Sequence, residues 1–360
     1  MSPQRVSSLL SLILLATVVL PLPSAAAIYV DCDNTSGQED GTWEHPYRLI
    51  SEGMAAAGFG DTVAVLPGFY SESHGVDMHD PLGMNCASVI MRDGVVLLST
   101  DGPDSTTIEG MGTEAAVYFD ECGPQTALIG FTIETAGTGW GLRTSVMCYS
   151  SSPLIDSNVM LQCDNGIFCR GWSSPSILDN IVGSGTIGFA GGSGGTVAGN
   201  EVEGCINVMT EGPGSLPLVI ESNTIGVARN DFTGDRDTIG VGVSSWSEGG
   251  NVTILNNTIQ GKDVGAKLCL GVLHGNRFTD NTVNIEIGVL AYCSPWEDID
   301  AEANWWGTTD PEEIDAKIID CYDDPSLESC VDFDPWCLDE ACTQTAVGEF
   351  SWGAIKALYR

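Results

Sequence analysis

The sequence predicts an all-β protein built as a single parallel β-helix, and three observations support this fold. Residues 151–159 (SSPLIDSNV) and 173–181 (SSPSILDNI) repeat nearly the same nine residues 22 positions apart. Related segments follow at 215–225 (SLPLVIESNTI) and 251–259 (NVTILNNTI). Short β-branched pieces alternate with Gly, Asn, Asp and Ser, without helical periodicity. Three short strands with their turns make one coil of about 22 residues.

One Asn per coil marks the repeat. Asn tolerates left-handed backbone at a tight turn, and its side chain can bond the same side chain one coil above. We therefore expect a stacked row of Asn residues, with one inserted loop in its longest gap. The gaps are 22, 20, 23, 34, 24 and 23 residues, between Asn158, Asn180, Asn200, Asn223, Asn257, Asn281 and Asn304.

The N-terminal elements precede the first coil. Residues 1–27 combine a basic start, an apolar run and the small residues SAAA, which is typical of a cleaved signal peptide. We therefore expect a secreted or cell-surface protein. IYVD then predicts a strand, and GDTVAVLPGFYSE predicts the entry into the first coil. Between them, PYRLISEGMAAAG predicts a short amphipathic helix whose apolar face carries Ile50, Met54 and Ala57.

The C-terminal end of a solenoid must also be covered, because open strand edges pair with other chains. We expect the β-helix with its N-terminal cap to span residues 28–310, where Trp305 and Trp306 plug the core. A C-terminal cap is expected at 311–342, and a linker with an amphipathic tail at 343–360.

The composition limits the partners. With 49 acidic and 13 basic residues, the net charge is −36, which disfavours nucleic acid and anionic membranes. Carboxylates outside the cell collect divalent cations, so Ca²⁺ is a candidate cofactor. No apolar stretch after the leader is long enough to span a bilayer, and we expect a monomer.

The 13 Cys residues follow the same register in part. Cys148 and Cys169 occupy equivalent coil positions, as do Cys269 and Cys293, and stacked strands lie about 4.8 Å apart. Each pair is expected to be adjacent, either as a disulfide or as part of a buried thiol ladder. An exported chain meets oxidising conditions, so pairing is also expected in the C-terminal cap, among Cys321, Cys330, Cys337 and Cys342.

Several segments together resemble a known superfamily. GDTVAVLPGFYSE, GVVLLSTDGPDSTTIEG, GFTIETAG, the SSPxI…N repeats and NWWGTTDPEEI are similar to secreted bacterial right-handed parallel β-helix proteins of the pectate-lyase-like superfamily. The resemblance covers roughly residues 28–337 and implies a three-faced, right-handed solenoid. Members of the superfamily include polysaccharide lyases, glycoside hydrolases, esterases and adhesins, so the resemblance does not decide the chemistry.

Candidate site residues fall into three groups. In the insertion ARNDFTGDRDTIG, three Asp residues are candidate Ca²⁺ ligands and two Arg residues are weak catalytic candidates, although a solvated loop explains them as well. A second loop mixes His and Asp in SESHGVDMHDPLG, a set that suits a transition metal. Three Trp residues in or beside predicted turns are candidate glycan platforms, although buried packing at the turns explains them as well. The residues are Asp231, Asp235, Asp237, Arg229, Arg236, His74, Asp77, His79, Asp80, Trp140, Trp172 and Trp246.

Three functions fit these residues. A secreted or cell-surface solenoid that binds polysaccharide is the first choice, because no catalytic set is assembled in the sequence. A Ca²⁺-dependent polysaccharide lyase or a glycoside hydrolase is the second, and a structural or adhesive surface solenoid is the third. The polygalacturonase-like hydrolase pattern includes a GHG that this chain lacks, and its one DD pair, Asp323 and Asp324, falls in the expected cap.

Overall fold

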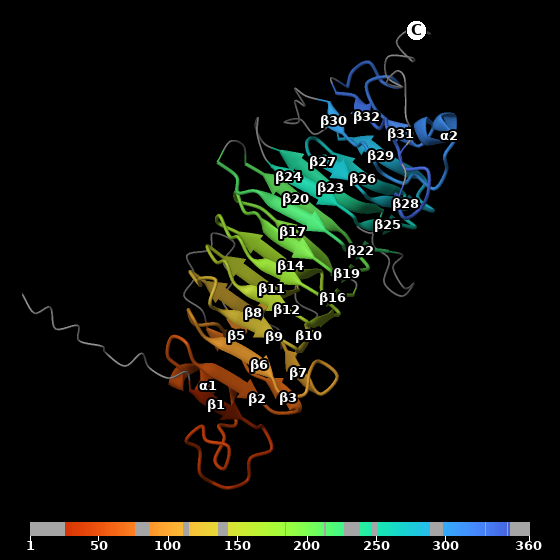
Figure 1. The fold of residues 1–360 in the computed structure, drawn as a ribbon. Helices are drawn as coiled ribbons and strands as arrows, with labels where there is room; N and C mark the ends of the chain where they lie inside the picture. The colour runs from red at the N-terminus through yellow and green to blue at the C-terminus, as the bar shows by residue number, and fades with distance from the viewer. Residues whose placement is uncertain are drawn as a thin grey trace, which may run out of the picture.

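The strands wind into one right-handed parallel β-helix that rises from the N-terminal to the C-terminal end (Figure 1). Each coil gives one strand to each of three sheets, and the nine strands of the second sheet mark nine complete coils. Partial coils extend both ends. The computed structural model describes residues 26–75, 86–110, 115–135, 143–183, 185–211, 214–226, 238–245, 251–288, 298–327, 329–343 and 345.

Neighbouring strands pair in parallel in all three sheets, apart from the antiparallel pair at the start of the third. The first sheet contains β1 (Ala27–Val30), β2 (Thr62–Val65), β6 (Val96–Ser99), β9 (Ala127–Ile129), β12 (Leu154–Asp156), β15 (Ser176–Leu178), β18 (Gly195–Ala198), β21 (Leu218–Glu221), β24 (Val252–Leu255), β27 (Val272–His274), β30 (Ile299–Asp300) and β32 (Val331–Asp332). The second contains β3 (Gly68–Ser71), β7 (Thr106–Glu109), β10 (Thr132–Glu134), β13 (Val159–Leu161), β16 (Ile181–Val182), β19 (Glu201–Val202), β22 (Thr224–Ile225), β25 (Thr258–Gln260) and β28 (Arg277–Thr279). The third contains β4 (His74–Gly75), β5 (Cys86–Ile90), β8 (Ala115–Asp120), β11 (Thr144–Tyr149), β14 (Asn165–Arg170), β17 (Thr186–Phe189), β20 (Ile206–Thr210), β23 (Ile239–Ser245), β26 (Val264–Leu268), β29 (Val283–Ile287) and β31 (Ile318–Ile319).

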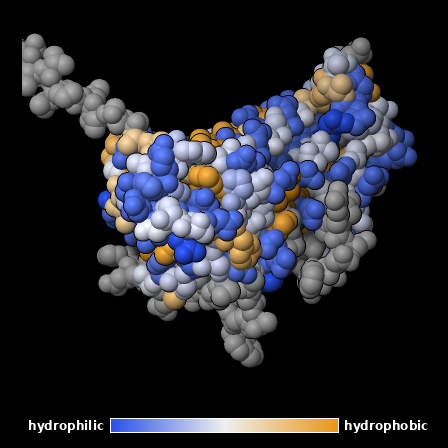
Figure 2. Space-filling view, turned by 90° about the horizontal axis from the view of Figure 1, so that it is seen from below, coloured by the Kyte–Doolittle hydropathy of each residue, from blue (hydrophilic) through white to orange (hydrophobic). Residues whose placement is uncertain are grey.

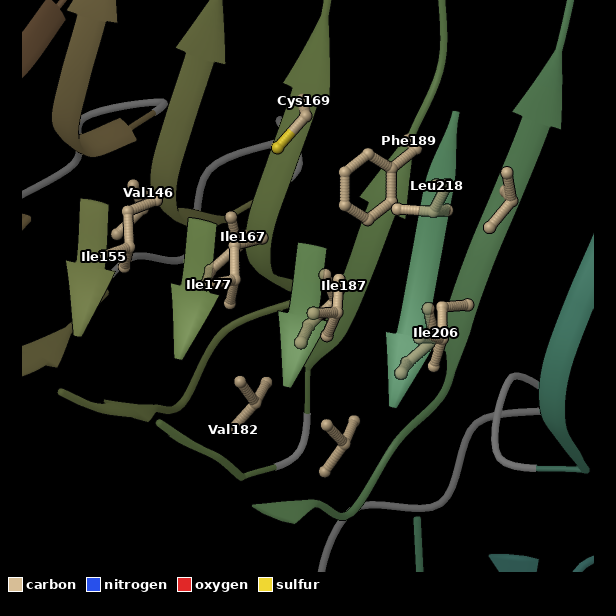
Figure 3. Close-up of a cluster of buried hydrophobic side chains, with 14 of the residues drawn as sticks. Val146, Ile155, Ile167, Cys169, Ile177, Val182, Ile187, Phe189, Ile206 and Leu218 are labelled. Carbon is tan, nitrogen blue, oxygen red and sulfur yellow. The ribbon is translucent and has the colours of Figure 1, made fainter. Parts of the chain in front are cut away.

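The core lies inside the coils, between the three sheets. Alternate side chains of each strand point inward, and equivalent residues of successive coils stack in register. In Figure 3, β-branched residues of the first and third sheets face one another across this interior. Each is fully buried, as in the row formed by Val146, Ile167, Ile187 and Ile206.

A continuous Asn ladder runs along the corner between the first and second sheets. In each step the Oδ1 atom of one Asn accepts the backbone N–H and the Nδ2 of the Asn one coil before it. For Asn180 to Asn200 these distances are 2.8 and 3.0 Å. The Nδ2 of Asn200 also donates to the carbonyls of Ile177 and Ala198, at 2.9 and 3.0 Å. Each buried amide is thereby satisfied, which makes the corner highly stabilising.

The ladder confirms six of the seven predicted Asn residues and corrects the other. Asn276, not Asn281, follows Asn257, whose N–H donates to the Asn276 Oδ1 at 3.0 Å. Equal spacing favoured Asn281, but the chain uses a coil of 19 residues and then one of 28, as the separations of the two ladder bonds show. Asn281 lies at a different corner, where its Oδ1 accepts the N–H of Lys262 at 3.0 Å.

The left-handed backbone at the Asn corner also differs from the prediction. It falls on the residue immediately before each ladder Asn, so the Asn itself is not left-handed. This residue varies, because only its backbone has to turn. The set is Ser157, Asp179, Gly199, Ser222, Asn256, Gly275 and Ala303.

The repeated SSP motif has its own role at the corner between the third and first sheets. The N–H of Ser151 donates to the Ser173 Oγ, and the N–H of Ser173 donates to the Ser193 Oγ, both at 3.0 Å. All three side chains are buried. The nine-residue repeat therefore encodes two internal ladders, a short one of Ser and a long one of Asn.

The Cys residues separate into thiols and disulfides. Cys148 and Cys169 are register partners, as predicted, and both are free, buried thiols rather than a disulfide. Burial raises the pKa of the Cys148 thiol well above its ordinary value, and contact with Cys169 adds to the shift. In the cap, disulfides join Cys321 to Cys330 and Cys337 to Cys342, which confirms the predicted pairing there. Cys269 is disulfide-bonded, while Cys293 lies outside the described residues.

The N-terminal cap is the predicted helix, α1 (Ile50–Ala56), with Ile50, Met54 and Ala57 buried. The Glu72 carboxylate accepts the N–H groups of Ile50 and Ser51 at 2.7 and 3.2 Å and so satisfies two donors of the first turn. β1 begins at Ala27, the last residue of the predicted leader, and pairs with β2. Residues 1–25 and 346–360 lie outside the described part of the chain.

The C-terminal end is closed by aromatic stacking and a short helix, α2 (Pro311–Asp315). The Trp306 ring is 1% exposed and stacks on Phe278, with ring centroids 5.0 Å apart. Phe333 of the cap meets Trp306 edge-on at 6.2 Å. Trp306 thus plugs the core as predicted, whereas Trp305 is only half-buried. No helix among the described residues is long and apolar enough to cross a membrane.

Candidate functional site

The outer face of the third sheet carries an aromatic platform, defined here as Phe168 and Trp172. The alternation of β14 sends Ile167 and Cys169 into the core, so Phe168 and Arg170 point outward. Trp172 follows two residues after Arg170, in the turn toward the first sheet. One strand and its turn therefore display two aromatic rings on the same side of the molecule.

Glycines of the next coil make room for both rings. A Cβ at Gly188 would come within 2.6 Å of the Phe168 ring, and a Cβ at Gly192 would come within 2.6 Å of the Trp172 Nε1. Phe168 is also packed against the buried side chain of Met147. The rings consequently lie over the backbone of β17 and its turn, which only glycine at these two places allows.

Trp172 is fixed and exposed at the same time. Its Nε1 donates to the carbonyl of Gly214 at 3.3 Å, from a turn two coils further along. Its backbone is left-handed, with φ of 58°, which costs a non-glycine residue about 1 kcal/mol. The side chain is nevertheless 59% exposed. A strained, anchored and exposed Trp is typical of a binding residue.

Exposed side chains of β20 border the platform. Asn207 and Met209 point outward from this strand and are exposed, Met209 by 37%. Between them and the platform lie Gly188 of β17 and Ala190, which follows this strand, and both residues are small. Elsewhere among the described residues, large exposed hydrophobic residues are scattered. The face drawn in Figure 2 shows small orange patches between hydrophilic ones.

The charge of this face differs from that of the chain. Among the described strands of the third sheet from β5 to β31, the charged residues are Asp120, Arg170, Lys267 and Glu286, which sum to zero. Lys267 and Glu286 form an ion pair with an N–O distance of 2.5 Å. The strands of the first sheet carry four carboxylates and no Lys or Arg, at Asp156, Glu221, Asp300 and Asp332.

A second cluster lies at the C-terminal end of the first sheet. His274, Asp300 and Asp332 point outward from three neighbouring strands, and the His274 Nε2 lies 2.7 Å from the Asp300 Oδ1. Glu302 follows Asp300, and burial together with Asp300 and Asp332 raises the pKa of its carboxyl above the ordinary 4.5. A carboxyl whose pKa is raised by neighbouring carboxylates is a candidate general acid.

One group of three potential metal ligands occurs among the described residues, at Asp31, Cys32 and Asp33. Their ligand atoms lie within 4.8 Å of one another. The Asp31 Oδ1 already accepts the N–H of Asp33 at 2.9 Å, a local turn that brings the side chains together without any ion.

Comparison with known proteins adds a family. A protein-family model described as "Protein of unknown function (DUF1565)" matches residues 34–267. The chain belongs to the DUF1565 family. A search of curated proteins found no match to it.

Solved structures similar to this DUF1565 protein are distant. A rhamnogalacturonan lyase is 12% identical with a TM-score of 0.38, over 72% of this chain and 74% of its own. A pectin methylesterase from Aspergillus niger, in deglycosylated form, is 12% identical with a TM-score of 0.37, over 82% of this chain and 97% of its own. Likenesses at this level carry no argument about function.

The structure describes only two of the predicted site residues of the DUF1565 chain, Trp172 and His74. Trp172 is exposed and belongs to the platform. His74, from the predicted His and Asp group, bonds Glu72 at 3.0 Å. The other candidates lie outside the described residues, namely Arg229, Asp231, Asp235, Arg236, Asp237, Trp140, Trp246, Asp77, His79 and Asp80.

Sequence reasoning missed Phe168, Asn207 and the cluster around Glu302. The signal for Phe168 was present, because Cys169 was expected to stack on Cys148 and the preceding residue of a strand points to the opposite face. The cluster had no such signal. His274 and Asp332 are 58 positions apart and meet only because three coils stack in one register.

Proposed function

We propose that this protein is exported and binds polysaccharide on the outer face of its third sheet, without cleaving it. The observation that carries the proposal is Trp172, whose ring is fixed by the Gly214 carbonyl and the Gly192 backbone yet remains 59% exposed. Burial of an indole face against a ligand is the gain that would offset its strained backbone.

The chemistry of the platform suits sugars. An aromatic face attracts the C–H groups of a sugar ring, because the face of the π-system is negative. Hydroxyl groups need a few placed polar partners, and the exposed amide of Asn207 supplies both a donor and an acceptor. The two fixed rings would place two sugar units of one chain across β17.

The described strands of the same face do not bring together the carboxylate pair that hydrolysis needs. Its two carboxylates among the described strands, Asp120 and Glu286, are seven strand steps apart. At about 4.8 Å per step this is roughly 34 Å. Glycoside hydrolysis requires two carboxyl groups about 5 to 10 Å apart. The platform therefore supports binding and not cleavage.

Export is supported by the C-terminal cap. The disulfides Cys321–Cys330 and Cys337–Cys342 close short loops, and such bonds persist in oxidising compartments. With the leader-like residues 1–27, they favour a location outside the cytoplasm, either in the medium or on the cell surface.

The test is binding to a panel of polysaccharides by calorimetry or retention, with Trp172→Ala compared to the parent protein. We expect at least a tenfold loss of affinity, about 1.4 kcal/mol, because the exposed indole supplies most of the stacking area. Trp43→Ala is the matched control, since Trp43 is 61% exposed at the N-terminal end. Equal binding by both variants would remove the platform from the proposal.

A second function is favoured by the cluster around Glu302. Its carboxyl, whose pKa is raised by burial and by Asp300 and Asp332, belongs to a group of carboxyls such as a glycoside hydrolase site requires. Incubation with the same polysaccharides and measurement of new reducing ends tests this function. Cleavage that disappears in Glu302→Gln would establish a hydrolase, whereas ultraviolet-absorbing products that require Ca²⁺ would indicate a lyase. Absence of both products leaves the protein as a binder.

A further inference from the structure

The charge of the third sheet indicates which polysaccharides the platform accepts. The chain carries a net charge of −36, so an acidic polymer approaching it is repelled overall. At physiological ionic strength, however, exposed charges act over only about 8 Å. Whether an acidic polymer binds therefore depends on the charges of the binding face and not on the net charge of the chain. That face must be positive to hold an acidic polymer.

The described strands of this face carry no net positive charge. Their four charged residues sum to zero, and Lys267 is held by Glu286 at 2.5 Å. Arg170 lies beside the platform, but it already has an interaction partner. Apart from Arg170, the outward-facing groups across β17 from the two rings are the neutral side chains of Asn207 and Met209 and the backbone of Gly188 and Ala190.

We propose that the ligand of this face is a neutral polysaccharide, held by ring stacking and amide hydrogen bonds and not by charge. This inference rests on the proposed function, because it names the substrate class of the same platform. It predicts binding that is insensitive to salt and to removal of Ca²⁺, since neither stacking nor a neutral hydrogen bond is screened by ions.

The experiment titrates the full exported protein with one neutral and one acidic polysaccharide, at low and high salt, with Ca²⁺ or with EDTA. We expect the neutral polymer to bind with an affinity that changes less than twofold across these conditions. The acidic polymer should not bind. Binding of the acidic polymer that requires Trp172 would overturn the inference while leaving the proposed function in place.

A charge variant tests the selectivity itself. Asn207→Lys adds one cation beside the rings without altering them, because Asn207 is exposed. We expect this variant to gain salt-sensitive binding to the acidic polymer, and a variant that does not gain it contradicts the charge argument. If neither polymer binds the parent protein, or binding is the same in Trp172→Ala, the proposed function fails as well.

Discussion

Two corners of the β-helix use the same geometry for opposite purposes. The corner between the first and second sheets carries an unbroken Asn ladder from Asn158 to Asn304, fully buried and alike in every coil. The corner between the third and first sheets carries a Ser ladder that ends at Ser193. Beyond Ser193, the turn that follows β20 reaches back to Trp172 through the Gly214 carbonyl.

The difference shows which corner stabilises the fold and which corner can carry residues for function. A repeated residue stabilises each coil because its partner is the same residue one coil away. At the other corner the Ser ladder stops before the longer turn that follows β20, and this turn bonds the exposed Trp172. Asn207 is exposed on β20, the strand that leads into this turn. Function is therefore expected where successive coils cease to be equivalent.

The largest expected effect comes from Asn200, a buried residue of the Asn ladder, compared with the exposed Asn207 of β20. Asn200→Ala removes the acceptor of two Asn180 donors and the donor to Ile177 and Ala198 carbonyls. Each buried group left without a partner costs about 1 to 3 kcal/mol, so we expect a loss of at least about 3 kcal/mol of unfolding free energy. Urea unfolding followed by circular dichroism measures it.

Asn207→Ala is the matched control, because Asn207 is exposed on β20. We expect this variant to unfold within about 0.5 kcal/mol of the parent protein and to bind polysaccharide more weakly. If instead Asn207→Ala destabilised the protein as much as Asn200→Ala, the division between a stabilising corner and a functional face would be wrong.

The predictability of the two corners differs for the same reason. The Asn row, the coil length and both caps followed from the sequence, because a repeat is visible without knowing which coils touch. The wrong residue in the Asn row, Asn281 for Asn276, arose because a coil of 19 residues and one of 28 have nearly the same sum as two regular coils. Gly275 was the available signal, since a turn residue precedes every ladder Asn.

The platform could be predicted only in part. Trp172 was identifiable as an aromatic residue near a turn, but its fixation depends on Gly192 and Gly214, which are 20 and 42 positions away. Those contacts depend on the register between coils of unequal length. The residues of the platform differ from the residues at equivalent positions of other coils. A repeat in the sequence therefore does not predict them.

A glycine variant separates the position of Trp172 from its presence. Gly192→Ala places a Cβ within 2.6 Å of the Trp172 Nε1 and puts alanine at φ of 72°. The left-handed backbone costs alanine about 1 kcal/mol, and the displaced Trp172 ring loses its hydrogen bond to the Gly214 carbonyl. We expect polysaccharide affinity to fall about tenfold, or about 1.4 kcal/mol, with only a small drop in melting temperature.

Gly214→Ala is the control for that variant. A Cβ at Gly214 meets no atom within 4 Å, and its carbonyl remains available to Trp172. We expect unchanged stability and unchanged affinity, measured by the same titration. If the two glycine variants weakened binding equally, the position of the Trp172 indole would not determine the affinity for polysaccharide.

The smallest expected effect concerns the end of the first sheet, where the coils also cease to repeat. Burial, Asp300 and Asp332 raise the pKa of Glu302 in the folded state, so the folded protein binds a proton more readily than the unfolded chain. Its stability contribution is therefore complete below about pH 4.5 and declines as the pH rises through the folded pKa.

Glu302→Gln removes this decline. We expect the variant to melt slightly above the parent protein at neutral pH and together with it at acidic pH, in melting curves recorded across that range. The opposite order would mean that ionised Glu302 stabilises the cap, and the outer face of the first sheet would then have its own ordered polar network instead of unrelieved repulsion.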